Sequence, residues 1–273
     1  MWNRKCGMVN TVVPRLLFQH PAFKIPHSLA FETSSAVGSV ALGHGAEVLE
    51  SRTLRRPKAH AQSAARPVSL VATWFLPTIK ALCEAHQVEP THVERVYVSA
   101  GPGSFTGLRM GVTAARMIAL GIDARVVGVP TLEVIAQNAL DADPPPSCVA
   151  VVLDAKRNRV YTAAFIRQGG AYVATSEAIE ADPFEFLAAQ PEDCAVLGEG
   201  VLYHRPAIES SNRRILPESL YRPRAETVYR LGFDRAERGQ FSDPRSLIPT
   251  YIRPPEAEEV WERKQIQGRE STE

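Results

Sequence analysis

The chain has 273 residues, and its 31 Lys and Arg residues nearly balance its 30 Asp and Glu residues, which leaves a formal net charge of +1. Such a weak net charge does not favour nucleic acid or a membrane surface as a direct partner. A hydrophobic share of 45% with 22% charged residues is typical of a folded chain with one large or two medium cores. No run approaches the roughly 20 apolar residues that cross a bilayer.

Residues 1–28 begin with positive charge, but Pro14 and Arg15 interrupt the apolar run that a secretory signal needs. We interpret this segment as a poorly ordered extension or a misassigned start.

The cysteines stand far apart, form no CxxC pair and have no His-rich neighbourhood, so zinc spacing is absent. We expect them to be reduced, buried thiols, as suits the cytosol. They are Cys6, Cys83, Cys148 and Cys194.

After the extension, the chain has the pattern of a small antiparallel unit. Apolar residues 29–31, 37–42 and 46–49 predict three strands, separated by the polar bend Glu-Thr-Ser-Ser and by Gly-His-Gly. A long helical pattern follows at 67–88, and Pro77 within it predicts a kink or two helical pieces.

A glycine-rich turn then stands between a strand and a helix. Residues 96–98 predict the strand, and "GPGSFTG" at 101–107 leads into a helix with Ser104 as N-cap and Gly121 as C-cap. Free N–H groups at such a helix start could hold a phosphate, or the segment could be only a tight turn with a capped helix.

Small residues follow one side of this helix, at Gly107, Gly111, Ala114 and Ala115. A glycine inside a helix costs about 1 kcal/mol relative to alanine. We therefore expect close approach by a second helix, which belongs either to this chain or to a partner.

The prolines of "DADPPP" at 141–146 predict a boundary, after which the pattern repeats. Residues 148–166 contain a strand, a bend with Asp154 and a returning strand. Residues 29–42 have the same order, with Glu32 in the bend, and this repetition indicates an internal duplication. These two acids could hold a magnesium-bound nucleotide between two lobes, or could be merely solvated or capping.

Five segments occur in one order along the chain: "LAFETSSAVGSVAL", "GPGSFTGLRMGVTAARMIALG", "GVPTLEVIAQNA", "LDAKRNRVYTAAF" and "PTYIR". Together they resemble the bacterial TsaB family, also called YeaZ, over residues 29–253. The resemblance implies an α/β fold of two lobes, similar to actin, Hsp70 and acetate kinase, with duplicated βββαβα units. The expected divisions are an N-terminal lobe at 29–140, a C-terminal lobe at 147–255 and a solvated, charged tail at 256–273.

TsaB proteins are partners of TsaD, which transfers threonylcarbamoyl to the adenosine beside the anticodon of tRNAs that read ANN codons. The resemblance implies a non-catalytic, cytoplasmic subunit that binds TsaD as a heterodimer and TsaE through the complex, with a homodimer as the form it takes alone. We expect tRNA to meet it only through the complex. No tightly bound cofactor is implied, although ATP or ADP is associated with the complex interface.

TsaD-like proteins bind a metal through a His-x-x-x-His pair, and the matching stretch here is "GVPTLEVI". Thr131 and Ile135 stand at the two histidine positions, and isoleucine has no lone pair to offer a metal. We therefore expect neither a metal site nor a catalytic residue.

The resemblance also assigns residues to two sites. The helix after the glycine turn would meet TsaD, or a second copy of this chain, through Gly107, Leu108, Arg109, Gly111, Val112, Ala115, Arg116 and Ala119. A vestigial nucleotide site would comprise Glu32, Thr33, Ser34, Gly101, Gly103, Ser104 and Asp154.

The chain departs from the family at Glu32, where Asp is usual, at Arg159, where an acid or amide is usual, and in an insertion near 63–74. Because fold does not fix function, an enzyme alternative stays open: a phosphotransferase that binds Mg-ATP between the lobes. The missing histidines argue against a metallopeptidase, and the sequence contains no HExxH, P-loop, GxSxG or GxGxxG motif.

Overall fold

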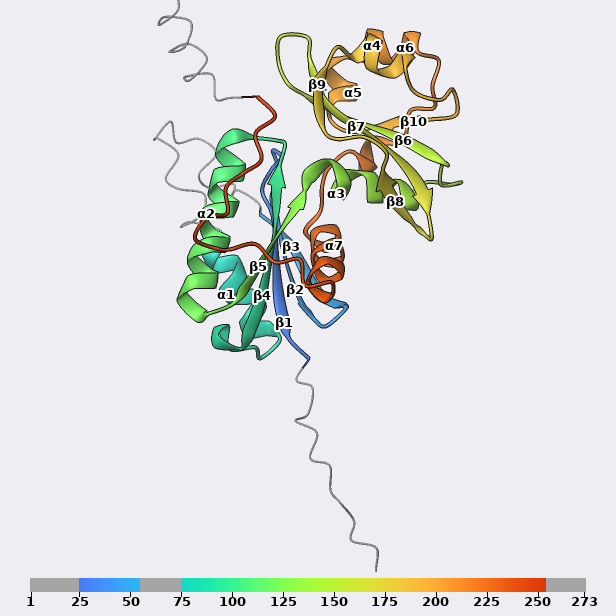
Figure 1. Ribbon diagram of the computed structural model, residues 1–273. Helices are drawn as coiled ribbons and strands as arrows, with labels where there is room; N and C mark the ends of the chain where they lie inside the picture. The colour runs from blue at the N-terminus through green and yellow to red at the C-terminus, as the bar shows by residue number, and fades with distance from the viewer. Residues whose placement is uncertain (1–24, 55–74, 254–273) are drawn as a thin grey trace, which may run out of the picture.

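Two mixed β-sheets form the frame of the computed structural model, which describes residues 25–54 and 75–253 (Figure 1). The first sheet has the strand order β3-β2-β1-β4-β5, and the second has the order β10-β6-β7-β8 with β9 also paired to β7. The first sheet contains β1 (His27–Glu32), β2 (Ser39–His44), β3 (Glu47–Thr53), β4 (Val93–Gly101) and β5 (Arg125–Pro130). The second contains β6 (Cys148–Asp154), β7 (Val160–Gln168), β8 (Ala171–Ala174), β9 (Ile179–Ala181) and β10 (Ala195–Leu197).

The two sheets share one topology. In each, three successive strands form an antiparallel meander, and a later strand joins the first strand of the meander in parallel. The duplication expected from the sequence is therefore confirmed, and so is the two-lobed, actin-like α/β fold.

Helices cover both faces of the first sheet, because its central strand is apolar on both sides. Leu29 and Phe31 of β1 belong to the core beneath α1 (Leu76–Ala85) and α2 (Phe105–Ile122). Ala30 points to the opposite face and packs with α7 (Ala225–Glu237).

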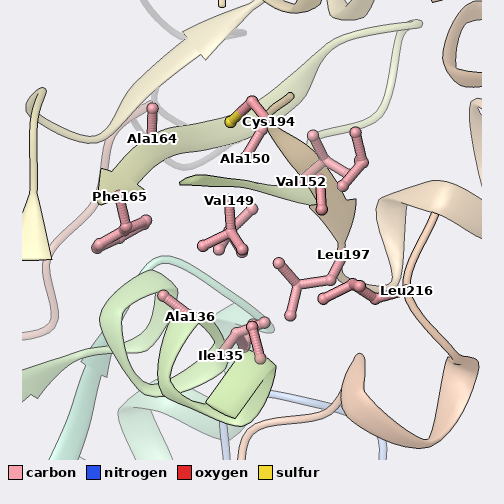
Figure 2. Close-up of a cluster of buried hydrophobic side chains, with 14 of the residues drawn as sticks. Ile135, Ala136, Val149, Ala150, Val152, Ala164, Phe165, Cys194, Leu197 and Leu216 are labelled. Atoms are coloured by element: carbon pink, nitrogen blue, oxygen red, sulfur yellow. The ribbon is translucent and has the colours of Figure 1, made fainter. Parts of the chain in front are cut away.

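The second sheet has its own core, in which α3 (Thr131–Gln137) takes part (Figure 2). Figure 2 shows Ile135 and Ala136 of α3 close to Val149 and Leu197. The remaining helices are α4 (Pro183–Ala188), α5 (Gly200–Tyr203) and α6 (Arg205–Ser210), with single 3-10 turns at Pro90–His92, Asn138–Asp141 and Glu218–Leu220.

Helices are thus exchanged between the two halves of the sequence. The first half supplies α3, which packs on the second sheet, and the second half supplies α7, which packs on the first (Figure 1). The lobe boundaries at 140 and 147 stay predictions. No helix in the described ranges is long and apolar enough to cross a membrane.

One expected boundary is wrong. His27 and Ser28 belong to β1 rather than to the N-terminal extension. Pro77 lies in the first turn of α1, where proline is tolerated. The residues that would form a second helical piece before it lie outside the described residues, so the expected kink stays a prediction. The expectations for residues 1–24, the insertion near 63–74 and the charged tail at 256–273 lie outside the described residues.

The ends of α2 show one confirmed cap and one wrong one. Ser104 is the N-cap, and its hydroxyl accepts from the Gly107 amide at 3.3 Å. The helix continues through Gly121 to Ile122, and Asp123 ends it in a left-handed conformation with φ of 56°. Aspartate is among the few residues that visit this conformation readily, so the helix ends at Asp123 without a glycine to mark the position.

The small residues of α2 face a turn of the same chain, not a second helix. A Cβ on Gly107 would stand 1.9 Å from the Thr33 carbonyl oxygen, and one on Gly111 would stand 2.2 Å from the Thr33 hydroxyl. The Thr33 hydroxyl donates to the Gly107 carbonyl at 2.8 Å. The expected helix–helix approach is therefore wrong, and the glycines make room for the turn between β1 and β2.

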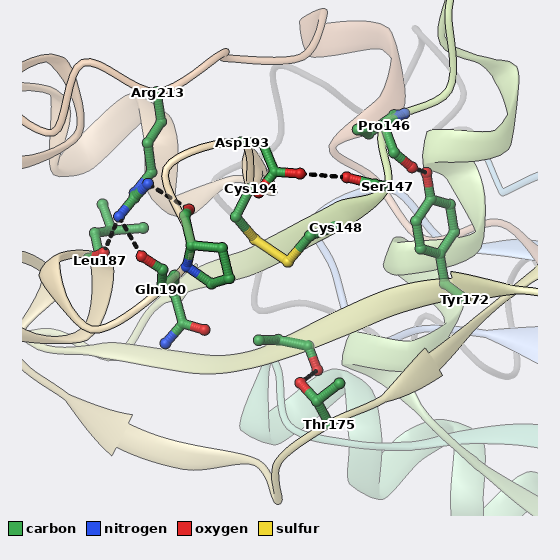
Figure 3. The surroundings of a disulfide bond; sticks show 12 residues. Pro146, Ser147, Cys148, Tyr172, Thr175, Leu187, Gln190, Asp193, Cys194 and Arg213 are labelled. Atoms are coloured by element: carbon green, nitrogen blue, oxygen red, sulfur yellow. Dashed lines mark hydrogen bonds between the residues drawn. A yellow bond between two sulfur atoms is a disulfide. The ribbon is translucent and has the colours of Figure 1, made fainter.

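Two cysteines form a disulfide, contrary to the expected reduced state (Figure 3). Cys148 starts β6, and Cys194 precedes β10, whose Ala195 pairs in parallel with Val149. This register brings the two Cα atoms to 4.5 Å across a sequence separation of 46, which spacing alone could not reveal. Cys83 is buried and free.

Gly107→Ala should lower the free energy of unfolding by about 2–3 kcal/mol, because the new methyl meets backbone that cannot retreat without moving the turn. Gly121→Ala is the matched control, since a Cβ there meets nothing within 4 Å. It should raise the free energy of unfolding by about 0.5–1 kcal/mol through helix propensity. Urea unfolding of both variants checks this, and equal stabilities would contradict the packing argument.

Candidate functional site

A pocket of about 430 Å³ lies between the two halves of the structure, and we call it the interlobe pocket. The first half contributes hydroxyl and glycine positions from the β1–β2 turn and the start of α2. The second half contributes charged and aromatic side chains from the β6–β7 hairpin and α5. The polar and aromatic lining residues are Ser34, Ser35, Ser104, Phe105, Thr131, Asp154, Lys156, Tyr161, Glu199, Tyr203 and Arg253.

The structure divides the seven residues expected at a nucleotide site. Four of them line the interlobe pocket: Ser34, Gly103, Ser104 and Asp154. The other three, Glu32, Thr33 and Gly101, do not line it and are buried. The predicted set thus includes pocket residues from both halves of the chain. Its other three members lie buried behind the pocket wall instead of lining the pocket.

Glu32 is sealed within the protein. Its carboxylate accepts from the amide and the hydroxyl of Ser34, both at 2.6 Å, and from the Ser99 hydroxyl. The side chain is fully buried, and this burial raises the pKa of Glu32 against the opposing effect of the hydrogen bonds from Ser34 and Ser99. Glu32 therefore holds the β1–β2 turn in place and cannot reach a ligand in the pocket.

Asp154 lines the pocket, but its oxygens already have partners. The Lys156 ammonium donates to it at 2.7 Å, the Lys156 amide at 3.1 Å, and His204 Nε2 lies 3.1 Å from its Oδ1. Burial acts to raise the pKa of Asp154, yet the hydrogen bonds from Lys156 and His204 outweigh it and leave that pKa below its ordinary value. Asp154 is thus a structural acid of the hairpin and its neighbour α5.

These carboxylates do not fit the magnesium ion that accompanies a nucleotide in kinases of this fold type. Magnesium requires carboxylate oxygens that can turn toward it. Asp154 is held by Lys156 and His204, and Glu199 lies 3.3 Å from Arg222. Across the described ranges, no three His, Cys, Asp or Glu side chains form a cluster that could hold a metal ion.

Thr131 and Ile135, the residues at the two histidine positions, both lie on α3 and line the interlobe pocket, with Thr131 as the first residue of the helix. The Thr131 hydroxyl is buried and has no hydrogen-bond partner within the described structure. A buried unpaired hydroxyl costs free energy, so a polar ligand group here would find a ready partner.

The expected interface on α2 needs correction. Four of its members, Leu108, Val112, Ala115 and Ala119, are buried in the chain's own core and cannot form an exposed apolar surface. The exposed apolar side chains of the α1–α2 face are different ones: Leu76, Met117 and Leu120 are 49%, 69% and 53% exposed. We call these three residues the outer stripe. Helical spacing correctly identified which side of α2 is buried. It could not show that this side packs into the core of the same chain and not against a partner.

The two arginines expected at the rim of that interface are bound to the C-terminal strap, which we define as residues 240–253. Arg116 donates to the Pro244 and Arg245 carbonyls at 2.8 and 2.7 Å. Arg109 donates to the Tyr251 hydroxyl at 3.0 Å and lies 4.0 Å from the Phe105 ring centroid. Both arginines therefore hold a segment of their own chain.

The sequence prediction missed Lys156 and Arg253, which line the pocket, and His204, which contacts Asp154. Lys156 had a usable signal, because a residue two positions after an aspartate in a turn often donates to it. His204 and Arg253 had none, since only the tertiary fold brings residues so distant in sequence to Asp154 and its hairpin.

Comparison with known proteins agrees with this architecture. Residues 71–195 match a family model described as TsaD, tRNA N6-adenosine threonylcarbamoyltransferase. A Bacillus subtilis protein named tRNA threonylcarbamoyladenosine biosynthesis protein TsaB is 28% identical over 192 residues, covering 68% of this chain and 81% of the relative. The Escherichia coli protein of the same name is 30% identical over 139 residues, covering 51% of this chain and 54% of the relative.

The solved structure of YeaZ from Pseudomonas aeruginosa has a TM-score of 0.67 and 26% identity to this chain, covering 83% of it and 100% of the YeaZ chain. The fold is thus that of a two-lobed, actin-like α/β protein. Within that class, the chain is similar to proteins of the TsaB (YeaZ) family, whose named relatives are tRNA threonylcarbamoyladenosine biosynthesis proteins.

Glu32→Gln should flatten the pH dependence of the unfolding free energy. The folded state raises the pKa of Glu32 above the ordinary value of 4.5, so the folded state binds this proton more tightly than the unfolded chain does. The contribution of Glu32 to the unfolding free energy therefore falls as pH rises above about 4.5 toward neutrality. Urea unfolding from pH 4 to 8 measures the slope.

The matched control is Glu89→Gln, at an exposed position, which should keep the wild-type slope. A Glu32→Gln protein whose slope equals that of the wild type would contradict the assignment of a buried, tightly held proton to Glu32.

Proposed function

We propose that this chain is a non-catalytic partner subunit of TsaD, required for threonylcarbamoyl transfer to the adenosine beside the anticodon of ANN-decoding tRNAs. The names of its relatives support the pathway. A partner role rather than a catalytic one is supported by Thr131 and Ile135 at the histidine positions and by the paired state of Asp154. In this proposal TsaE binds through the complex with TsaD, and tRNA contacts the chain only within that complex. The expected location is the cytoplasm.

The observation that carries this proposal is the outer stripe. Leu76, Met117 and Leu120 are large apolar side chains exposed on the two helices that cover one face of the first sheet. Beneath them the buried face of α2 packs into its own core, and within the described part of the chain the three stripe side chains are about half exposed or more. Apolar residues in the centre of an interface supply most of its binding free energy. We propose the stripe, rather than the buried residues of α2, as the surface that meets TsaD or a second copy of this chain.

The direct test is size-exclusion chromatography with light scattering, with and without TsaD of the same organism, followed by a threonylcarbamoylation assay on tRNA. A heterodimer that is required for activity supports the proposal. Full activity of TsaD and its other partners without this chain would overturn it.

Leu120→Glu combined with Met117→Glu should weaken binding to TsaD by at least about 30-fold, because loss of central apolar contacts costs about 2 kcal/mol or more. Leu202→Glu is the matched control, since Leu202 is similarly exposed, at 45%, but lies on α5 away from the stripe. Titration calorimetry of the folded variants gives both affinities. Equal affinities for the stripe and control variants would remove the stripe from the interface.

The alternative, a phosphotransferase with Mg-ATP in the interlobe pocket, has less support, because Glu32 is sealed and Asp154 is paired. The unpartnered Thr131 hydroxyl favours a polar ligand in the pocket, and ATP or ADP without tight binding is compatible with this. We expect Asp154→Asn to retain at least about half of the wild-type threonylcarbamoylation rate, because the Lys156 side chain is 78% exposed and an ion pair with an exposed lysine contributes little. A loss as large as that from omitting the chain, in an assembled complex, would favour the alternative.

A further inference from the structure

The C-terminal strap is a third connection between the two lobes, and Figure 1 shows it along the α2 side of the molecule, whereas α3 and α7 lie on the other side. Elsewhere the chain passes between the lobes twice, after the 3-10 turn at Asn138–Asp141 and before α7. At these crossings the Asn138 amide donates to the Leu220 and Arg222 carbonyls at 3.0 and 2.8 Å. Two crossings on one side form a natural hinge, and proteins with such hinges close around ligands by rotating one lobe.

The first part of the strap is anchored to the first lobe. Figure 1 shows the strap leaving α7 and crossing the first sheet to reach α2. The Ser242 amide donates to the Val126 carbonyl of β5 at 2.8 Å, and the Thr250 amide donates to the Ala100 carbonyl of β4 at 2.7 Å. Leu247 packs against the core of the same lobe. The strap therefore has backbone anchors on two adjacent strands.

The last residue of the strap lies on the other lobe. Arg253 lines the interlobe pocket, and its guanidinium donates to the Ala155 carbonyl at 3.3 Å and to the Glu180 carboxylate at 3.4 Å. Ala155 belongs to the β6–β7 hairpin and Glu180 to β9, both in the second lobe. The Arg253 and Glu180 side chains are only about one-fifth exposed, at 20% and 21%, where an ion pair is less screened than at a fully exposed position.

We propose that the C-terminal strap is a brace that holds the interlobe pocket at one opening, with Arg253 as its latch on the second lobe. The hinge side is fixed by the two chain crossings, and the strap fixes the opposite side through a backbone anchor on β4 and an ion pair on β9. With both sides fixed, the lobes cannot rotate as they do in a closing enzyme. This inference concerns the chain by itself and holds whether or not TsaD is its partner.

The test uses the full chain in hydrogen–deuterium exchange. Arg253→Met should make exchange about tenfold faster in the Ile248–Ile252 segment, and also in β9 and the β6–β7 hairpin, because charge-assisted bonds are lost. Glu180→Gln removes the same pair from the second lobe and should act in the same places. Arg245→Met is the matched control, because Arg245 is an exposed strap residue whose side chain makes no contact that this structure shows within its described part.

A distance measurement separates a brace from a merely docked strap. Spin labels at Thr113 on α2 and Arg167 on β7, in a background of Cys6→Ser and Cys83→Ala, report the separation of the lobes. Arg253→Met and Glu180→Gln should each broaden the distance distribution, while Arg245→Met should not. Unchanged exchange, or faster exchange in the strap with an unchanged distance distribution, would overturn the proposal.

Discussion

The rest of the structure depends on the contact between the β1–β2 turn and the first turns of α2. The Thr33 carbonyl lies so close to α2 that only glycine fits at 107, and the Ser104 amide donates to the Ser34 carbonyl at 2.7 Å. This contact holds the N-cap Ser104 in place and buries Glu32 beneath the turn. It positions Ser34 and Ser104 in the wall of the interlobe pocket. It also orients α2, so that Val112 enters the core while Met117 points outward.

The same contact explains why the first-lobe acid does not act as a ligand. Glu32 ends β1 beneath the turn, where the Ser34 amide and the hydroxyls of Ser34 and Ser99 donate to its carboxylate. On the opposite wall Asp154 is held by a lysine of its own hairpin and by His204. Both acids therefore stabilise turns at the ends of equivalent strands, as the duplicated topology predicts, and neither is arranged for metal chemistry.

Exchange of helices between the halves links two of the buried cores, because α3 contributes Ile135 to the core of the second sheet and Val134 to the core beneath α7. α3 shares the core of the second sheet, and α7 covers the first sheet, with Tyr97 and Tyr229 in edge contact 5.4 Å apart. Neither lobe could bury its sheet without a helix from the other half of the sequence. The strap adds a third connection between the lobes. The outer stripe therefore lies on helices that are packed into a well-connected core.

The sequence by itself indicated the duplicated strand-acid-strand unit, because period-2 and helical patterns are local signals, while the two-lobed class of fold came from the resemblance of five segments to the TsaB family. The sequence also determined the Ser104 cap, which depends only on the turn that follows. Only the tertiary structure decided which surfaces those elements meet. Helical spacing identified Leu108 and Val112 as one face of α2 but could not say whose core they enter, and the disulfide required the register of β6 and β10. Contacts such as Arg253 with Glu180 join residues far apart in sequence, and no local pattern encodes them.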